Sequence, residues 1–76
     1  MSLAKYLNRF TTIHHKIKTR STGTPKQLAE ELHISESRLL DNLADLKAMG
    51  LPIEYDSASK TYFYSREVDI VIKINE

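Results

Sequence analysis

The chain contains no cysteine, and this absence removes several kinds of chemistry at once. Without thiols there is no disulfide framework, no thiolate metal site and no cysteine nucleophile. No apolar run approaches the ~18 residues that a membrane span needs, and no signal-peptide pattern opens the chain. These absences predict a cytoplasmic protein that makes no contact with a membrane.

Acidic residues are missing from the first third of the chain. Residues 1–26 carry six basic side chains and no acid, whereas residues 27–76 carry five basic and ten acidic ones. The formal net charge of +1 therefore hides a strong asymmetry. It predicts one basic surface for an anionic partner, or else a dipole that aids solubility or self-association.

Length and composition are those of one globular domain. The 76 residues leave room for a single domain, residues 1–76, and the hydrophobic fraction of 41% and charged fraction of 28% are ordinary. A core this small is marginal, so contact with a second copy would add useful burial.

The first predicted helix covers roughly residues 3–19. Apolar residues recur at steps of three and four, which is the period of a helix with one buried face: Leu3, Tyr6, Leu7, Phe10, Ile13 and Ile17. Four basic residues, here called the basic ridge, lie together beside this stripe if the helix continues to residue 20: Lys5, Arg9, Lys16 and Arg20. If this helix lies on the side of the fold away from the helices that bind the anionic partner, the basic ridge does not face that partner and needs another one.

Two shorter helices are predicted at about 25–32 and 36–49. Thr24-Pro25-Lys26-Gln27 is typical of a helix start with a capping box, and Ser35 is a good N-cap for the next helix. Gly50 ends that helix in the left-handed conformation that favours glycine. The residues expected to face the core are Leu28, Ala29, Leu32, Leu39, Leu43 and Leu46.

Extended segments are predicted at 53–56 and 61–65, and the four residues between them make a hairpin. Residues 68–74 alternate apolar side chains and predict a third strand. A β-branched strand at a sheet edge is prone to pairing, so it packs onto the first helix or pairs with a second copy. The predicted fold class is α+β, a three-helix bundle followed by a hairpin and a C-terminal strand.

The stretch from Thr24 to Tyr64 resembles the winged helix-turn-helix domains of DeoR-like and related bacterial transcription regulators. The resemblance rests on Leu28-Ala29-Glu30-Glu31-Leu32, Ile34-Ser35, three leucines, Gly50-Leu51-Pro52-Ile53 and a tyrosine-rich hairpin where the family has its wing. It implies a winged-helix fold, double-stranded DNA as the partner, and a recognition helix over 36–49 that enters the major groove.

Two positions depart from the family pattern. His33 stands in the turn where such motifs usually have glycine, and a non-glycine residue at positive φ costs about 1 kcal/mol. Leu40 and Asp41 stand where the recognition helix of the DeoR-like group often carries arginines. The family's base contacts are therefore not transferred to this chain.

Candidate DNA contacts follow from the predicted faces. Ser37, Arg38 and Asp41 lie nearest the bases, because the leucines of the same helix point inward. Arg38 can bond guanine O6 and N7, and Asp41 can accept from a cytosine amino group. The candidate phosphate contacts come from helix starts and from the hairpin: Thr24, Lys26, Ser35, Lys60 and Tyr62.

Aspartates facing a polyanion are costly, and this supports an alternative, a winged-helix protein-interaction module that binds no DNA. A self-associating structural unit is a third interpretation. No enzyme chemistry is indicated, because no base accompanies the serines and the adjacent His14 and His15 point about 100° apart. No metal, cofactor or small-molecule ligand is predicted. The predicted partners are double-stranded DNA and a second copy, through Val68–Ile74 or the first helix.

Overall fold

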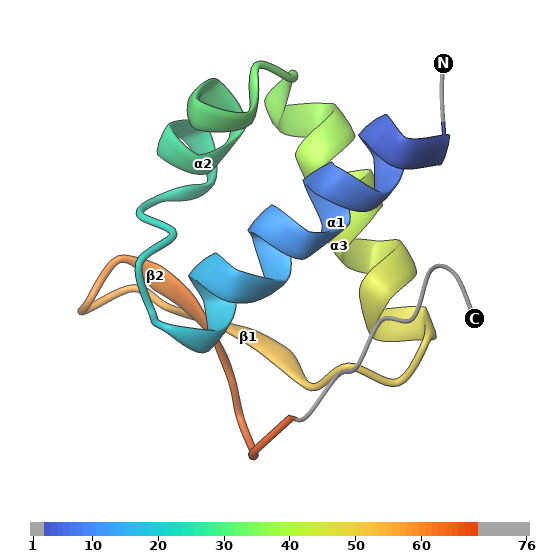
Figure 1. The fold of residues 1–76 in the computed structure, drawn as a ribbon. Helices are drawn as coiled ribbons and strands as arrows, with labels where there is room; N and C mark the ends of the chain where they lie inside the picture. The colour runs from blue at the N-terminus through green and yellow to red at the C-terminus, as the bar shows by residue number, and fades with distance from the viewer. Residues whose placement is uncertain (1–2, 69–76) are drawn as a thin grey trace.

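The computed structural model describes residues 3–68, except for the side chains of Leu3 and Tyr6. Three helices, α1 (Leu3–Lys18), α2 (Pro25–Leu32) and α3 (Glu36–Ala48), precede two strands, β1 (Ile53–Asp56) and β2 (Thr61–Tyr64). The strands form one antiparallel hairpin. This order matches a winged-helix-like arrangement, and the predicted α+β class is confirmed (Figure 1).

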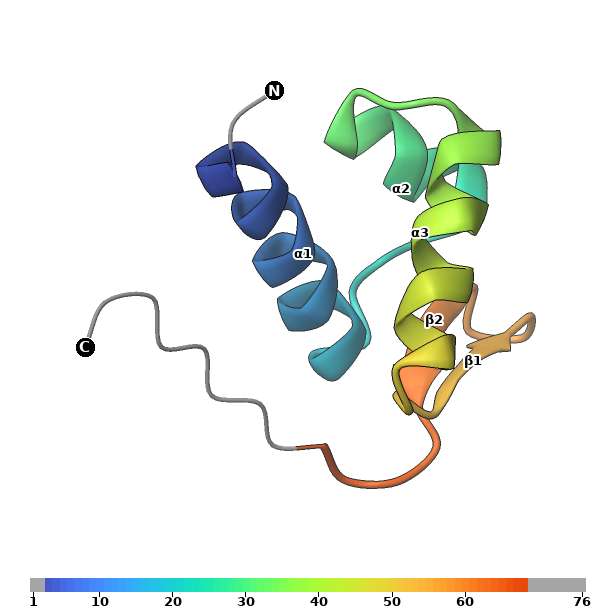
Figure 2. The ribbon, with the colours of Figure 1, turned by 90° about the vertical axis from the view of Figure 1, so that its right-hand side faces the viewer.

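The three helices enclose one side of the core and the hairpin closes its lower end. Figure 1 shows α1 crossing in front of α3, with α2 beside the start of α3. In Figure 2, turned by a quarter turn, α1 and α3 stand on opposite sides of the molecule. The contacts between elements join α2 to α3, α1 to β2 and α3 to β1. No helix in residues 3–68 is long and apolar enough to cross a membrane.

The predicted N-caps of α2 and α3, Thr24 and Ser35, both form. The Thr24 hydroxyl accepts from the Gln27 backbone N–H at 3.2 Å, and the Gln27 side chain accepts from the Thr24 N–H at 2.8 Å. Gly23 (φ +74°) makes room for this box, because a Cβ there would lie 2.6 Å from Gln27 Oε1. The Ser35 hydroxyl accepts from the Arg38 N–H at 3.0 Å, so α3 begins at its predicted cap.

Left-handed residues end α2 and α3. His33, at φ 60° and ψ 42°, takes the position where winged-helix turns usually have glycine. The chain thus keeps the turn and bears the strain of a side chain in that conformation. Gly50, at φ +102°, follows α3 as predicted.

The core draws on every element of the fold. Its buried members are Ile13, Ile17, Leu28, Ala29, Leu39, Leu43, Leu46, Ile53 and Tyr62. The inward positions predicted for α2 and α3 are confirmed, except that Leu32 is only half-buried and packs at the margin. The predicted stripe of α1 is confirmed at Ile13 and Ile17; the side chains of Leu3 and Tyr6 lie outside the described part of the chain.

The loop between α1 and α2 holds the hairpin through side chains. The buried Thr22 hydroxyl accepts from the Tyr62 backbone N–H at 2.8 Å, and the Thr22 N–H donates to the Thr61 hydroxyl at 3.2 Å. Farther along β2, the Tyr64 hydroxyl lies 2.7 Å from His14 Nδ1 on α1. These contacts fix the hairpin against the helices.

Two predicted boundaries differ from those of the structure. The first helix ends at Lys18, and Arg20 takes a left-handed φ of 55° outside it. The condition on which the basic ridge was predicted, a helix that continues to Arg20, is therefore not met. β2 ends at Tyr64, one residue earlier than predicted. The predicted strand over 68–74 lies, apart from Val68, outside the described residues.

Candidate nucleic-acid interface

The outer face of α3 is open to solvent. Leu39, Leu43 and Leu46 hold its inner side, at 0, 2 and 6% exposure. Its exposed residues are Glu36, Ser37, Arg38, Leu40, Asp41, Ala44, Asp45, Lys47 and Ala48. At 100° per residue, Ser37, Ala44 and Ala48 fall within about 40° of one another and directly opposite the leucines. This strip of small side chains lets another surface approach the helix backbone closely.

A cationic hollow lies at the start of α3. It has a volume of about 280 Å³ and is lined by Arg9, Ile34, Ser35 and Arg38. Arg9 comes from α1, so tertiary packing brings one member of the predicted ridge beside the predicted base-contacting arginine. The backbone of Arg38 is fixed by the Ser35 hydroxyl and by the Asn42 amide, which donates to the Arg38 carbonyl at 2.6 Å. Two arginines and a serine hydroxyl suit a phosphate group.

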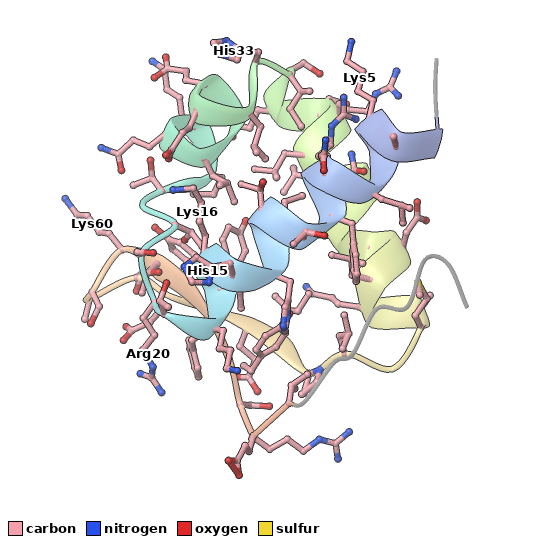
Figure 3. All side chains as sticks on the ribbon, viewed as in Figure 1. Lys5, His15, Lys16, Arg20, His33 and Lys60 are labelled. Carbon is pink, nitrogen blue, oxygen red and sulfur yellow. The ribbon has the colours of Figure 1, made fainter. Side chains whose placement is uncertain are left out.

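The other predicted phosphate contacts are spread over two elements. Thr24 and Lys26 lie at the start of α2, where the threonine hydroxyl is engaged in the capping box and the lysine is exposed. Lys60 extends from the exposed hairpin turn at φ 55°, and Figure 3 shows it pointing away from the body of the molecule. Lys26 and Lys60 are thus both exposed, one on α2 and the other on the hairpin turn.

Tyr62 lies largely in the core, and its role as a backbone contact stays a prediction. The side chain is 6% exposed and belongs to the core. Burial, followed by the nearby Tyr55 and Glu36, raises the pKa of the Tyr62 hydroxyl. The exposed aromatic residue of the hairpin is Tyr55, at 36% exposure, whose ring stands edge-on to Tyr62 at 4.9 Å. The alternation of side chains along a strand does not show which tyrosine of the cross-strand pair Tyr55 and Tyr62 is covered by the helices.

The members of the basic ridge have different surroundings. The Lys16 ammonium pairs with Glu31 on α2 at 2.6 Å. The Arg20 guanidinium lies 4.8 Å from the centre of the Phe63 ring. Figure 3 shows Lys5, Lys16 and Arg20 along the side of the molecule formed by α1, with α3 behind. Of the four ridge residues, Arg9 is the one that lines the hollow at the start of α3.

The charges of α3 are mixed. Asp41 and Asp45 share the exposed side with Arg38 and flank the strip of small residues. Because like charges repel, these two carboxylates oppose the approach of a phosphate backbone. The favourable charges lie at the edges of the face, at its start and on the hairpin.

No group of three or more histidine, cysteine, aspartate or glutamate residues within 3–68 is placed to hold a metal ion. His14, one of the adjacent pair, is engaged by Tyr64 and stacks near Phe10.

Comparison of the chain with protein-family models, with curated protein sequences and with solved structures finds no match. The resemblance to DeoR-like regulators therefore remains a prediction from the motif residues.

Proposed function

We propose that the chain is a small cytoplasmic DNA-binding protein, a transcriptional regulator, that inserts α3 into the major groove of double-stranded DNA. The observation that carries the proposal is the outer face of α3. It pairs a strip of small residues with Arg38, in a helix held from behind by three buried leucines. A major groove about 12 Å wide admits a helix of this kind.

The positions of the cations support the same orientation. The hollow shared by Arg9 and Arg38 would receive a phosphate at one edge of the groove. Lys26 would contact the DNA backbone from the start of α2. Lys60 would contact it from the hairpin, which would act as the wing. Ser37 and Arg38 would then lie nearest the base edges, and Arg38 would read guanine.

Selection from random duplex DNA, followed by fluorescence anisotropy on the selected site, tests the proposal. Arg38→Ala should weaken binding to that site about 5- to 150-fold, since a bidentate contact to guanine is worth ~1–3 kcal/mol. Lys47→Ala, which removes the same charge in the last turn of α3, should weaken it less than about threefold. Equal losses for both variants, or no selected sequence at all, would count against base reading by α3.

The same selection reports on dimerisation. Two copies that bind together should select a palindrome whose half-sites lie about one helical turn, ~34 Å, apart. We propose such a dimer, paired through Val68–Ile74 or α1, because a core of this size gains from added burial. A single, non-repeated half-site with one chain bound would instead mean that the protein binds as a monomer.

A protein-interaction module is the second candidate function, and exposed apolar residues on α3 and at its C-cap favour it. Leu40 is 49% exposed and Met49 is 74% exposed, and both flank the face that carries Asp41 and Asp45. Asp41→Asn and Asp45→Asn separate the two functions. Removal of a carboxylate should strengthen duplex binding if DNA is the partner, whereas it should weaken capture of a basic protein partner.

A further inference from the structure

A second hollow lies at the opposite end of α1, away from the start of α3. Its volume is about 410 Å³, and it opens between the last turn of α1 and the segment that follows β2. The volume falls within the ~300–1,000 Å³ that small-molecule sites occupy. No sequence motif marks this place, because its walls come from residues more than forty positions apart.

The walls of this hollow combine an apolar floor with an excess of positive charge. Val68 and the ring of Tyr64, both half-buried, provide apolar surface, above the fully buried Ile17. Three cationic side chains surround them, Lys18, Arg20 and Arg66, against one carboxylate, that of Glu67. The surroundings therefore favour an anion that carries an apolar body.

Helix-end electrostatics alone do not account for this cluster. Lys18 complements the negative end of the α1 dipole, which is an ordinary role for a lysine in a last turn. Two of the last carbonyls of α1 already have partners, because the Arg20 N–H donates to the Ile17 carbonyl at 3.1 Å and the Ser21 N–H donates to the Lys16 carbonyl at 2.9 Å. Arg66 arrives from a different segment, so the helix end does not explain its place here.

Neighbouring groups show the effect of the same positive charge. Burial lowers the pKa of His14 below 6.5, and the charge of Lys18 lowers the same pKa further. Arg20 is oriented by its position over Phe63, and Tyr64 is oriented by His14 Nδ1 at 2.7 Å. Tyr64 is thus held in place before any ligand arrives, which reduces the cost of ordering it on binding.

We propose that this hollow binds a small organic anion, with one acidic group held among the cationic side chains Lys18, Arg20 and Arg66 and an apolar body laid over Tyr64 and Val68. A carboxylate or a phosphate monoester presents the same oxygens to two guanidinium groups. The site is separate from the α3 face, so it does not depend on the proposed function. Because its walls include both α1 and β2, a bound ligand would tie the hairpin to α1.

NMR titration of the 76-residue chain at constant ionic strength tests the proposal. Benzoate and phenyl phosphate are the probes, and inorganic phosphate is the comparison without an apolar body. Either probe should cause saturable shifts of the backbone amides at residues 17–20 and 64–68, in about the millimolar range, and the tighter one identifies the acidic group. Inorganic phosphate should bind at least about fivefold more weakly.

Charge-removing variants supply the matched controls. Arg66→Gln and Arg20→Gln should each weaken binding of the tighter probe about tenfold, as expected for the loss of a charge-assisted hydrogen bond. Lys5→Gln removes one charge from the first turn of the same helix, roughly 20 Å from Lys18, and should change binding less than twofold. The spectrum of each variant reports directly whether it folds. Shifts that do not saturate, or equal losses in all three variants, would overturn the proposal.

Discussion

Replacing Thr22 by valine removes the hydroxyl that fastens the hairpin to the α1–α2 loop. Thr22 is 2% exposed, and its hydroxyl accepts from the Tyr62 N–H and donates to the Gly23 carbonyl at 2.9 Å. Valine has nearly the same shape, so packing is kept while the Tyr62 N–H loses its partner. A buried donor left without a partner costs about 1–3 kcal/mol.

The expected effect is large for a domain of this size. Since 1 kcal/mol shifts the Tm of a 60–100-residue domain by ~4–8 °C, Thr22→Val should lower Tm by roughly 4–24 °C. Urea unfolding followed by circular dichroism gives the free energy of unfolding directly. Thr11→Val is the matched control, because the exposed Thr11 hydroxyl donates only to the Leu7 carbonyl of its own helix. It should change the free energy by less than about 0.5 kcal/mol. Equal effects of the two substitutions would refute the claim that Thr22 holds the hairpin.

Three further outcomes are expected. His33→Gly should raise the free energy of unfolding by about 0.5–1 kcal/mol in urea, because glycine relieves a left-handed φ of 60° and the greater freedom of the unfolded chain offsets part of the gain; destabilisation would mean that the His33 side chain stabilises the turn. Leu43→Ala, at a position 2% exposed, should cost about 2–5 kcal/mol by thermal or urea unfolding, and a loss below about 1 kcal/mol would show that the core collapses around the cavity. Burial, and then the charges of Lys18 and His15, lower the pKa of His14 in the folded chain below 6.5. The unfolded chain therefore binds this proton more tightly than the folded chain does. The free energy of unfolding should fall as pH drops through about 6.5 and on through the folded-state pKa. His14→Gln should flatten that part of the profile in urea titrations from about pH 7.5 to about pH 5, and an unchanged profile would contradict the assignment.

The helices were predictable because short-range chemistry sets their ends. Thr24 and Ser35 cap their own helices within three residues, and Gly50 provides the left-handed stop. The start of the first helix and the position of its buried stripe follow from apolar spacing alone. Its end does not, since Arg20 turns into a left-handed conformation and places its guanidinium over Phe63, a contact across 43 positions of the chain.

The candidate site was predictable only in part, for the same reason. Periodicity identified the exposed face of α3, including Ser37 and Arg38. It did not reveal that Arg9 of α1 shares a hollow with Arg38, because that contact depends on how two helices pack. It also did not reveal that Tyr62 is covered, because the helices and not the strand pattern decide which face of a two-stranded hairpin is buried.

The salt dependence of binding to the selected duplex tests the central claim most directly. Arg9, Lys26, Arg38 and Lys60 offer three or four phosphate or base contacts, so the slope of log K against log salt should be roughly −3, at about −0.9 per phosphate. Affinity should then fall about 40- to 150-fold between about 50 and about 200 mM salt, and Lys60→Ala should reduce the slope by about 1. An affinity that does not change with salt would contradict the account of α3 and its flanking cations as a DNA-binding surface.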